Sequence, residues 1–413
     1  MEAGEGGLLP DRADKEGATM PETMSGLDDR MREGLGRVAS ADVVVGIPSY
    51  NNAATIAHVA NAVATGLREG FPNAKAVIVS SDGGSEDGTS QVVLDTVRDV
   101  PVIAGAYRGL PGKGSALRAI FECTVALEAR AGAVVDSDLR SITPQWVRRL
   151  LGPIAEGQAD YITPLYGRHK HDGTITNSIA YPLTRALYGV RIRQPIGGEF
   201  GFSGDLARRF VDEGDWQGHI ARFGIDIYMT TTALLDGARI AQAFLGAKIH
   251  DPKDPGADLA PMFSQVVGTL FDLAGKNADR WREVSGSREA PVIGDVAPVE
   301  PEVVNASVDI LRSKYAAARA ENAALWEEVL GSVPASLGPR EWARVVYAFL
   351  AASVRNPGRR DRYVTALVPL YFARVARFIE DAADMNTAEF ERLVEQQAIA
   401  FEEEKGSLRD RLP

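Results

Sequence analysis

The sequence has very little cysteine, since Cys123 is the only one among 413 residues. A single thiol excludes an internal disulfide framework and argues against a zinc site built from cysteine ligands. Cys123 lies in the apolar, helix-like stretch AIFECTVAL, which is typical of a buried and unreactive thiol. We therefore do not expect cysteine chemistry to carry the function.

Long apolar runs and runs of basic residues are also missing. No run reaches the roughly 18 apolar residues that a membrane-spanning helix needs, and the N-terminus has no apolar signal-peptide core. We therefore expect a cytoplasmic protein with no membrane partner. The formal net charge of -11 and the lack of Lys/Arg-rich runs argue against nucleic-acid binding. An acidic chain that binds an anionic substrate needs a metal ion, a few basic side chains or backbone amides at that place.

Two familiar nucleotide-binding motifs are absent from the sequence. The stretch RGLPGKGSAL is like a P-loop, but Tyr107 stands where that motif needs its first glycine, and Gly114 stands where it needs Ser or Thr. The first predicted strand ends in GIPSYNN without Gly-x-Gly-x-x-Gly, which removes the main support for a dinucleotide dehydrogenase. The segment PGKG is then either a surface turn or a loop that offers the Lys113 ammonium and several amides to a diphosphate.

What the sequence does contain is a regular alternation of strand-like and helical patterns. Apolar, strand-like runs cover 41–50, 74–89 (ending in a turn cluster), 101–106 and 133–138, and helical spacing covers 54–70, 89–100 and 114–132. Continuous apolar strands that alternate with helices are typical of parallel sheets covered on both faces. The predicted class is therefore α/β, with a Rossmann-like, mostly parallel sheet flanked by helices.

Composition divides the chain into four parts. Residues 1–38 predict a flexible N-terminal tail with a short helix over 28–38, and residues 39–285 predict the main α/β domain, with halves at about 39–140 and 141–285. The Pro- and Gly-rich stretch 286–302 predicts a linker, and apolar spacing of three and four residues over 303–413 predicts a helical C-terminal domain. Six aromatic residues are expected to fill the core of that domain or a subunit contact: Trp326, Trp342, Tyr347, Phe349, Tyr371 and Phe372.

Polar segments follow three of the predicted strands, at 48–52, at 82–85 and at Asp136-Ser-Asp138. Ligands of open parallel sheets gather at the carboxyl ends of strands, where these segments lie. The carboxylates of Asp136 and Asp138 project to the same side of their strand. They either begin an ordinary turn or provide hard oxygen ligands to Mg²⁺ or Mn²⁺, which also bind phosphate oxygens.

Histidine is scarce, with five in the chain. His58 lies on a predicted helix and is expected to be structural. His169 and His171 belong to a polar loop that either faces an anionic acceptor or is simply solvated. His250 closes a strand-like run, and this position allows its imidazole to join Asp138 on one cation.

Seven segments together resemble the GT-A glycosyltransferases that make glucosyl-3-phosphoglycerate, mannosylglycerate and glucosylglycerate. In chain order they are IPSYNN, SSDGGSEDGT, PGKGSAL, DSDL, QPIGGEF, GIDIY and LGAKIHDPKDP, and they span roughly 43–270. The resemblance implies a GT-A fold, in which 39–285 is the catalytic domain with a nucleotide-binding and an acceptor half. The helical C-terminus resembles that of the mannosylglycerate and glucosylglycerate makers more loosely.

The resemblance also implies a role for each matching residue. The donor nucleotide sugar would contact Pro48, Ser49, Tyr50, Asn52, Asp82, Gly83, Lys113, Asp136 and Ser137. Among these, Asp82 would reach the base and Asp136 the ribose. The acceptor side would consist of Arg168, Gly173, Thr174 and Thr176. Asp138 and His250 would bind Mg²⁺ or Mn²⁺. The implied catalytic residues are Lys113 near the diphosphate, Glu199 at the sugar hydroxyls and Asp226 at the transferred sugar or its acceptor.

One position departs from the phosphoglycerate-using enzymes, which carry an arginine where this chain has Thr174. A threonine hydroxyl cannot bind a phosphate bidentately, which favours D-glycerate as the acceptor. Four residues nearby can replace the lost charge, which keeps 3-phosphoglycerate as the alternative: Arg168, His169, Lys170 and His171.

The prediction is therefore a glycosyltransferase that moves a hexose, glucose first and mannose second, from a UDP-, GDP- or ADP-sugar to D-glycerate. The resemblance implies retention of the anomeric configuration. No strand-end carboxylate is placed as a nucleophile, so we expect front-face attack, in which an oxygen of the leaving group takes the acceptor proton. The alternatives are a GT-A transferase with a polysaccharide or lipid acceptor and a nucleotidyltransferase, whose usual basic glycine-rich loop after the first strand is missing here. We also expect a homodimer.

Overall fold

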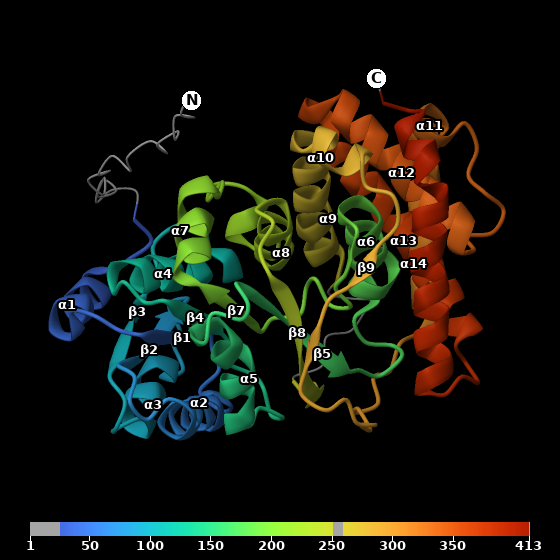
Figure 1. Ribbon diagram of the computed structural model, residues 1–413. Coiled ribbons are helices and arrows are strands. Elements are labelled where there is room, and N and C mark those ends of the chain that lie inside the picture. The colour runs from blue at the N-terminus through green and yellow to red at the C-terminus, as the bar shows by residue number, and fades with distance from the viewer. Residues whose placement is uncertain (1–24, 251–258, 413) are drawn as a thin grey trace, which may run out of the picture.

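The alternating apolar runs fold into one mixed sheet with the strand order β10-β8-β5-β7-β4-β1-β2-β3 (Figure 1). The computed structural model describes residues 25–250 and 259–412. The strands of this sheet are β1 (Val43–Ser49), β2 (Ala76–Asp82), β3 (Val102–Ala106), β4 (Ala131–Val134), β5 (Tyr161–Gly167), β7 (Phe200–Ser203), β8 (Ile240–Ala247) and β10 (Val292–Ile293). All neighbouring pairs are parallel except those that β7 makes with β4 and β5. The predicted α/β class with a mostly parallel, helix-flanked sheet is confirmed.

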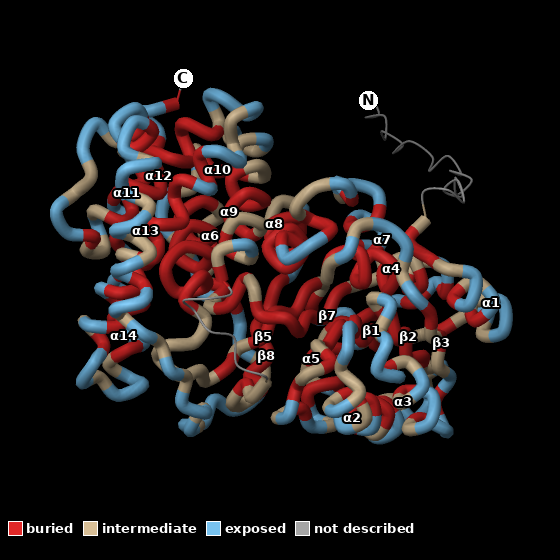
Figure 2. The backbone as a smooth tube through the Cα atoms, turned by 180° about the vertical axis from the view of Figure 1, so that it is seen from behind, coloured by how far each residue is buried: buried red, intermediate tan, exposed pale blue. Residues whose placement is uncertain are grey.

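Helices cover both faces of the sheet, which explains why its strands are apolar along their whole length. Residues of β1 alternate between two hydrophobic cores, so that Val44 packs on one side and Val43 and Val45 on the other. Figure 2 shows these strands as buried segments between the helix layers. The covering helices are α2 (Ile56–Gly70), α3 (Thr89–Thr96) and α5 (Pro144–Ala155) on one side, and α1 (Asp29–Val38), α4 (Lys113–Ala126), α7 (Gly204–Glu213) and α8 (Ile225–Leu235) on the other.

The prediction of a flexible tail over 1–38 is wrong for residues 25–38, while 1–24 lie outside the described residues. The predicted short helix is present as α1 and packs against β3. Asp28 fixes it, because its Oδ1 accepts the amide of Met31 (2.8 Å) and its Oδ2 accepts the amide of Ala106 (2.9 Å). Met31 is fully buried in the same core as Ile103. Leu27 is buried in this core too, and Ser25 and Gly26 donate to the carboxylate of Glu122. A few buried side chains and carboxylate contacts therefore hold a segment whose composition is otherwise polar.

The stretch 286–302 contains two short strands rather than a plain linker. The strand β9 (Arg288–Glu289) pairs with β6 (Val190–Arg191), and β10 forms the edge of the main sheet beside β8. Pro291 has no amide proton, but its carbonyl oxygen accepts the amide of Gln242 in β8 (2.8 Å). Proline is tolerated at such an edge position, where no donor is needed.

The predicted C-terminal helices are present and pack onto the α/β part. They are α11 (Val308–Leu330), α12 (Pro339–Arg355), α13 (Arg360–Asp381) and α14 (Thr387–Arg409). Figure 1 shows them standing beside α6 (Tyr181–Tyr188), α9 (Leu259–Lys276) and α10 (Ala278–Arg282), with which they share one hydrophobic core. The six aromatic residues predicted to fill this region are all buried. The core of the helical part thus includes residues from before the predicted boundary at 303.

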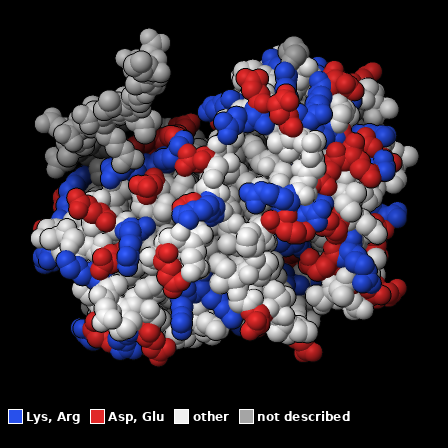
Figure 3. All heavy atoms as spheres, in the orientation of Figure 1, with Lys and Arg blue, Asp and Glu red and all other residues white. Residues whose placement is uncertain are grey.

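The surface is in keeping with the composition of the chain. Figure 3 shows acidic and basic side chains interspersed over one face, without a large basic patch there. None of the described helices is long and apolar enough to cross a membrane.

Candidate functional site

The polar residues of the predicted site meet at one edge of the sheet. Because β1, β2, β4, β5 and β8 run parallel, their carboxyl ends all lie at this edge. The antiparallel β7 contributes its beginning there, which brings Gly198 and Glu199 to the same place. Arg168 follows β5, and Lys248 and His250 follow β8. Segments more than a hundred positions apart in sequence are thereby neighbours.

One cavity at this edge brings together most of the predicted residues. Nine of them line it: Lys113, Asp136, Asp138, Arg168, Gly173, Thr174, Thr176, Asp226 and His250. Its remaining wall includes apolar side chains, namely Ile175, Ile196, Phe223, Leu259, Met262 and Val266. A cavity with a few charged groups on one side and an apolar wall on the other is the usual form of a small-molecule site.

Lys113 is held at the cavity by two carboxylates. It begins α4, and its Nζ lies 2.7 Å from Oδ1 of Asp136 and 3.4 Å from Oδ1 of Asp226. Burial by itself lowers the pKa of Lys113, but the neighbouring carboxylates raise it above its ordinary value. Burial likewise opposes ionisation of Asp136, while Lys113 and Lys248 hold its pKa well below the usual range. Both partners therefore stay charged.

The glycines around Lys113 are required by close packing. A Cβ on Gly114 would lie 1.8 Å from the carbonyl oxygen of Ile220, and a Cβ on Gly112 would lie 2.6 Å from that of Ala221. The amide of Gly114 also donates to the carbonyl of Arg222 (3.1 Å). The segment PGKG is thus not a free surface turn, because it is packed against 220–222 and carries Lys113 into the cavity.

Lys248 was not predicted, although it occupies the centre of the charged network. Its Nζ contacts Asp136 Oδ2 (3.2 Å), both carboxylate oxygens of Glu199 (3.0 and 2.9 Å) and the carbonyl of Gly197 (2.7 Å). The signal available in the sequence was its place after β8, two residues before His250. A lone lysine in GAKIH is not distinctive enough to be selected without the fold.

The structure places Glu199 behind Lys248 rather than at the cavity surface. Glu199 is fully buried, and Tyr166 donates a short hydrogen bond to its carboxylate. Burial raises the pKa of Glu199 to about 7, although Lys248 acts in the opposite direction. The implied contact between Glu199 and sugar hydroxyls is therefore not available here, and the residue supports Lys248 instead.

The residues implied in nucleoside binding form a second, interlocked group at the ends of β1, β2 and β4. Asn52 Oδ1 accepts the hydroxyl of Ser137 (2.8 Å) and the amide of Tyr50 (3.0 Å), and the Gly83 amide donates to the carbonyl of Ser49 (2.8 Å). Pro48 is the neighbouring position in β1. Tyr50 is 64% exposed, which leaves its ring available to a planar ligand.

Asp82 has no acceptor position left for a nucleobase. Its Oδ1 accepts the amides of Gly84 (2.8 Å) and Ser85 (2.7 Å), and its Oδ2 accepts the hydroxyls of Ser49 (2.9 Å) and Ser85 (2.7 Å). A carboxylate offers about four acceptor positions, so all of them are used within the protein. Asp82 fixes the turn after β2, and a contact with the base would require one of these bonds to break.

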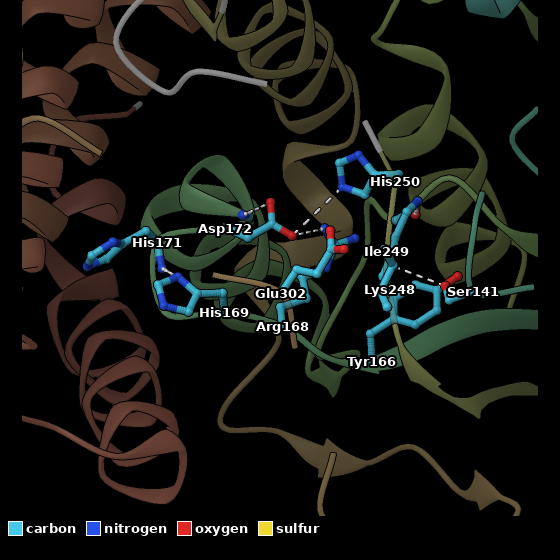
Figure 4. A network of polar contacts seen from close by, with 12 residues as sticks. Ser141, Tyr166, Arg168, His169, His171, Asp172, Lys248, Ile249, His250 and Glu302 are labelled. Atoms are coloured by element: carbon cyan, nitrogen blue, oxygen red, sulfur yellow. Dashed lines mark hydrogen bonds and ion pairs between the residues drawn. The ribbon is translucent and has the colours of Figure 1, made fainter. Parts of the chain in front are cut away.

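Asp138 and His250 line the same cavity, as the pattern predicted. Two bonds fix the chain before His250 beside that of Asp138. The Arg140 amide donates to the Ile249 carbonyl (2.9 Å). The Ile249 amide donates to Ser141 Oγ (2.9 Å) (Figure 4). A carboxylate and an imidazole, with phosphate oxygens and water in the remaining positions, suit Mg²⁺ or Mn²⁺. In the part of the chain that the structure describes, no group of three or more His, Cys, Asp or Glu side chains could hold a metal ion. A cation here would therefore depend on ligand oxygens as well.

The loop after β5 (168–176), named the acceptor loop here after the role that the resemblance implies, is fixed to the C-terminal helices. The Lys170 ammonium donates to three carbonyl oxygens in the turn that follows α13, at 2.6 to 3.3 Å. The hydroxyls of Thr174 and Tyr371 lie 2.7 Å apart, and His171 Nδ1 lies 2.9 Å from the Val304 carbonyl. Lys170 therefore cannot serve as the replacement charge for an acceptor, whereas Arg168 and His171 both line the cavity.

Arg168 is neutralised within the same loop. Its Nη1 lies 2.8 Å from Asp172 Oδ2, and its Nε is buried without a hydrogen-bond partner. Burial opposes ionisation of Asp172, but Arg168 and His250 hold its pKa well below the usual range. Asp172 was not predicted, because only the fold brings it next to residues that follow two different strands.

The mostly parallel sheet, with a charged cavity at the carboxyl ends of its strands, has the GT-A type of architecture. Residues 44–210 match the model of the family Glycosyl transferase family 2.

Within that class, the chain is similar to glucosyl-3-phosphoglycerate synthases. It is 31% identical to the enzyme of Mycolicibacterium smegmatis over 177 residues, which are 40% of this chain and 55% of that protein. It is 29% identical to the enzyme of Mycolicibacterium paratuberculosis over 182 residues, which are 40% of this chain and 52% of that one. The chain thus spans about half the length of the curated relatives that it matches.

A solved structure of glucosyl-3-phosphoglycerate synthase from Mycobacterium tuberculosis, in complex with Mn²⁺, UDP and phosphoglyceric acid, overlaps with 59% of this chain and 82% of that one. The sequence identity is 25% and the TM-score is 0.44. The family match and the sequence relatives confirm the predicted resemblance to GT-A glycosyltransferases of this type.

Proposed function

We propose that this protein is a metal-dependent, retaining glucosyltransferase that uses a nucleoside-diphosphate sugar and a three-carbon acid acceptor. The observation that carries the proposal is that Lys113, Asp226, Asp138, His250 and the acceptor loop all line the same cavity. The family model over 44–210 and the names of the relatives support the same reaction class.

Asp138 and His250 would hold Mg²⁺ or Mn²⁺. When bound, the cation would supply positive charge to the diphosphate of the donor. The residues fit this task because one oxygen and one nitrogen ligand leave most coordination positions to phosphate and water.

The other side chains act by charge and by position. Lys113 offers a permanently charged ammonium to the leaving diphosphate. Asp226 is oriented by the amides of Gly197 (3.2 Å) and Gly198 (3.0 Å), which donate to its Oδ2 and place its carboxylate at the cavity. The apolar wall limits water around the reacting groups. The acceptor hydroxyl would then attack on the face from which the diphosphate departs.

For the acceptor, we propose 3-phosphoglycerate first and D-glycerate second. The names of the relatives favour the phosphorylated acid, and Arg168 and His171 line the cavity where the charge of the missing arginine is needed. D-glycerate is favoured by Thr174, whose hydroxyl is shared with Tyr371, and by the pairing of Arg168 with Asp172. The preference for D-glycerate that the sequence suggested is therefore reversed.

The test is a panel of UDP-glucose, GDP-mannose and ADP-glucose against 3-phosphoglycerate and D-glycerate, with release of nucleoside diphosphate as the readout. We expect glucose transfer to 3-phosphoglycerate to be fastest and to stop with EDTA. Asp138→Ala and His250→Ala should each lose at least about 100-fold in turnover while the melting temperature stays within a few degrees.

The control is Asp95→Ala, which removes an exposed carboxylate of α3 that pairs with Arg98 at 3.1 Å. Near-normal turnover in both the Asp138 and the His250 variants would remove the proposed cation site. Release of pyrophosphate from a nucleoside triphosphate and a sugar phosphate would instead identify a nucleotidyltransferase. Light scattering of the same samples tests the proposed homodimer.

A further inference from the structure

The carboxylate of Asp172 lies between two side chains that come from different strands (Figure 4). Its Oδ2 lies 2.8 Å from Nη1 of Arg168 and 3.9 Å from Nε2 of His250. Its Oδ1 accepts the amide of Gly173 (2.7 Å). One oxygen therefore faces both the arginine of the acceptor side and the histidine of the proposed cation side.

Asp172 is itself held firmly in this position. Its amide donates to the carbonyl of His169 (2.8 Å), and its carbonyl accepts the side-chain amide of Asn177 (3.2 Å). Because β5 and β8 are paired neighbours, the residues that follow them meet at one point of the edge. Asp172 therefore lies where residues that follow both strands come together.

The contacts of Asp172 argue against direct binding of the metal ion by its carboxylate. It shares no group of three His, Cys, Asp or Glu side chains suited to a metal ion within the described residues. Its nearest charged partner is the guanidinium of Arg168. A carboxylate placed behind a ligating histidine is a common way to fix the orientation of the imidazole.

We propose that Asp172 is a positioning residue that fixes the orientation of the His250 imidazole and of the Arg168 guanidinium relative to each other. This inference rests on the proposed function, which supplies the cation and the acceptor. Its consequence is a coupling between the two sides of the cavity. When an acid group of the acceptor draws Arg168 away from Oδ2 of Asp172, this oxygen is left to His250 alone. The acceptor and the cation therefore each bind more tightly when the other is present.

The test measures Mn²⁺ affinity of the full chain by electron paramagnetic resonance in the presence of UDP, with and without 3-phosphoglycerate. In Asp172→Asn we expect Mn²⁺ binding to weaken about 10- to 100-fold, which is usual for the loss of an outer carboxylate. In the same variant, 3-phosphoglycerate should no longer raise the affinity for Mn²⁺. By reciprocity, Mn²⁺ should no longer raise the affinity for 3-phosphoglycerate. Asp172→Glu, which keeps the charge, should restore part of both effects.

The matched control is Asp160→Asn, at the opposite end of β5, where the carboxylate pairs with Arg239 at 2.6 Å. It should bind Mn²⁺ as the wild type does. If the Mn²⁺ affinities of the wild type and of Asp172→Asn lie within twofold of each other, only the role of Asp172 is overturned. Failure of the wild type to bind Mn²⁺ overturns the proposed cation site instead.

A second measurement needs no variant of Asp172 and so remains valid if that variant does not fold. With five histidines in the chain, ring ¹⁵N spectra can be assigned with the help of a His250→Gln sample. We expect the neutral imidazole of His250 to carry its proton on Nε2, the nitrogen that faces Asp172. A proton on the other nitrogen overturns the proposal.

Discussion

Glu199 is a fully buried carboxyl of the charged network whose ionisation is opposed by burial. Two ammonium groups, Lys113 and Lys248, face three carboxylates, those of Asp136, Asp226 and Glu199. The charges balance only when one carboxyl is protonated. Burial raises the pKa of Glu199 to about 7, which identifies it as the group that takes the proton.

Glu199→Gln should therefore gain stability relative to the wild type as the pH rises. A carboxyl whose pKa is raised on folding binds protons more tightly in the folded state, so its contribution to stability falls between about pH 4.5 and about pH 7 and is constant above. The difference in unfolding free energy between the variant and the wild type should grow by something on the order of 3 kcal/mol across this window. Urea unfolding at pH 5 and pH 8 measures it.

The control for this measurement is Glu321→Gln on α11, where the side chain is exposed. Its stability difference from the wild type should be the same at both pH values. A Glu199→Gln difference that is also independent of pH would contradict the assigned ionisation.

Between elements, the contact of α4 with the short 3₁₀ helix His219–Ala221 controls where Lys113 lies. Gly114→Ala would place a methyl group 1.8 Å from the Ile220 carbonyl oxygen, and its three nearest neighbours are all backbone atoms of Ile220 and Ala221, which cannot move aside easily. We expect a loss of about 1–3 kcal/mol in stability and a lower turnover, because α4 must shift and take Lys113 with it. Urea unfolding and the nucleotide-release assay measure the two effects on the same protein.

Gly36→Ala is the comparison variant, because we expect it to raise stability whereas Gly114→Ala lowers it. Gly36 is an exposed residue of α1 with nothing within 4 Å of an added Cβ. Alanine in a helix interior is favoured over glycine by roughly 0.5–1 kcal/mol, so this variant should be more stable and equally active. If Gly114→Ala behaves like Gly36→Ala, the packing of the loop does not set the position of Lys113.

The same elements show which parts of the molecule the sequence could predict. Strands such as β1 and β2 are buried on both faces, so their apolar runs reveal them, and parallel order then brings Asp138 and His250 to one edge. β7 runs antiparallel to its neighbours β4 and β5, and no local sequence pattern predicts this direction. Lys248 and Asp172 escaped prediction for the same reason, because their importance comes from partners that are distant in sequence. Composition also misled at α1, where the buried Met31 and the capping carboxylate of Asp28 hold a mostly polar segment against the sheet.

Over the whole chain, the helical C-terminus and the α/β part are joined through one hydrophobic core. The ring of Phe263 in α9 stacks on Tyr371 in α13 at 4.4 Å, and the indole of Trp342 donates to the Ser178 carbonyl (2.6 Å). Arg185 in α6 is 1% exposed and pairs with Glu395 and Glu402 of α14. Breaking such a pair by removing the acids leaves a buried charge uncompensated, at a cost of about 3–5 kcal/mol.

Removal of residues 303–413 should therefore destroy the fold of the remainder rather than release an independent catalytic domain. We expect the truncated chain to aggregate in light scattering and to lose its cooperative melting transition. A protease site inserted in the exposed stretch 294–298 provides the control, because it cuts the chain and leaves every helix in place. The cut protein should elute as one particle and keep its activity, since the shared core and not the peptide link holds the two parts together. A truncated chain that is monomeric and melts at the wild-type temperature would show that the boundary near 303 separates two self-sufficient domains.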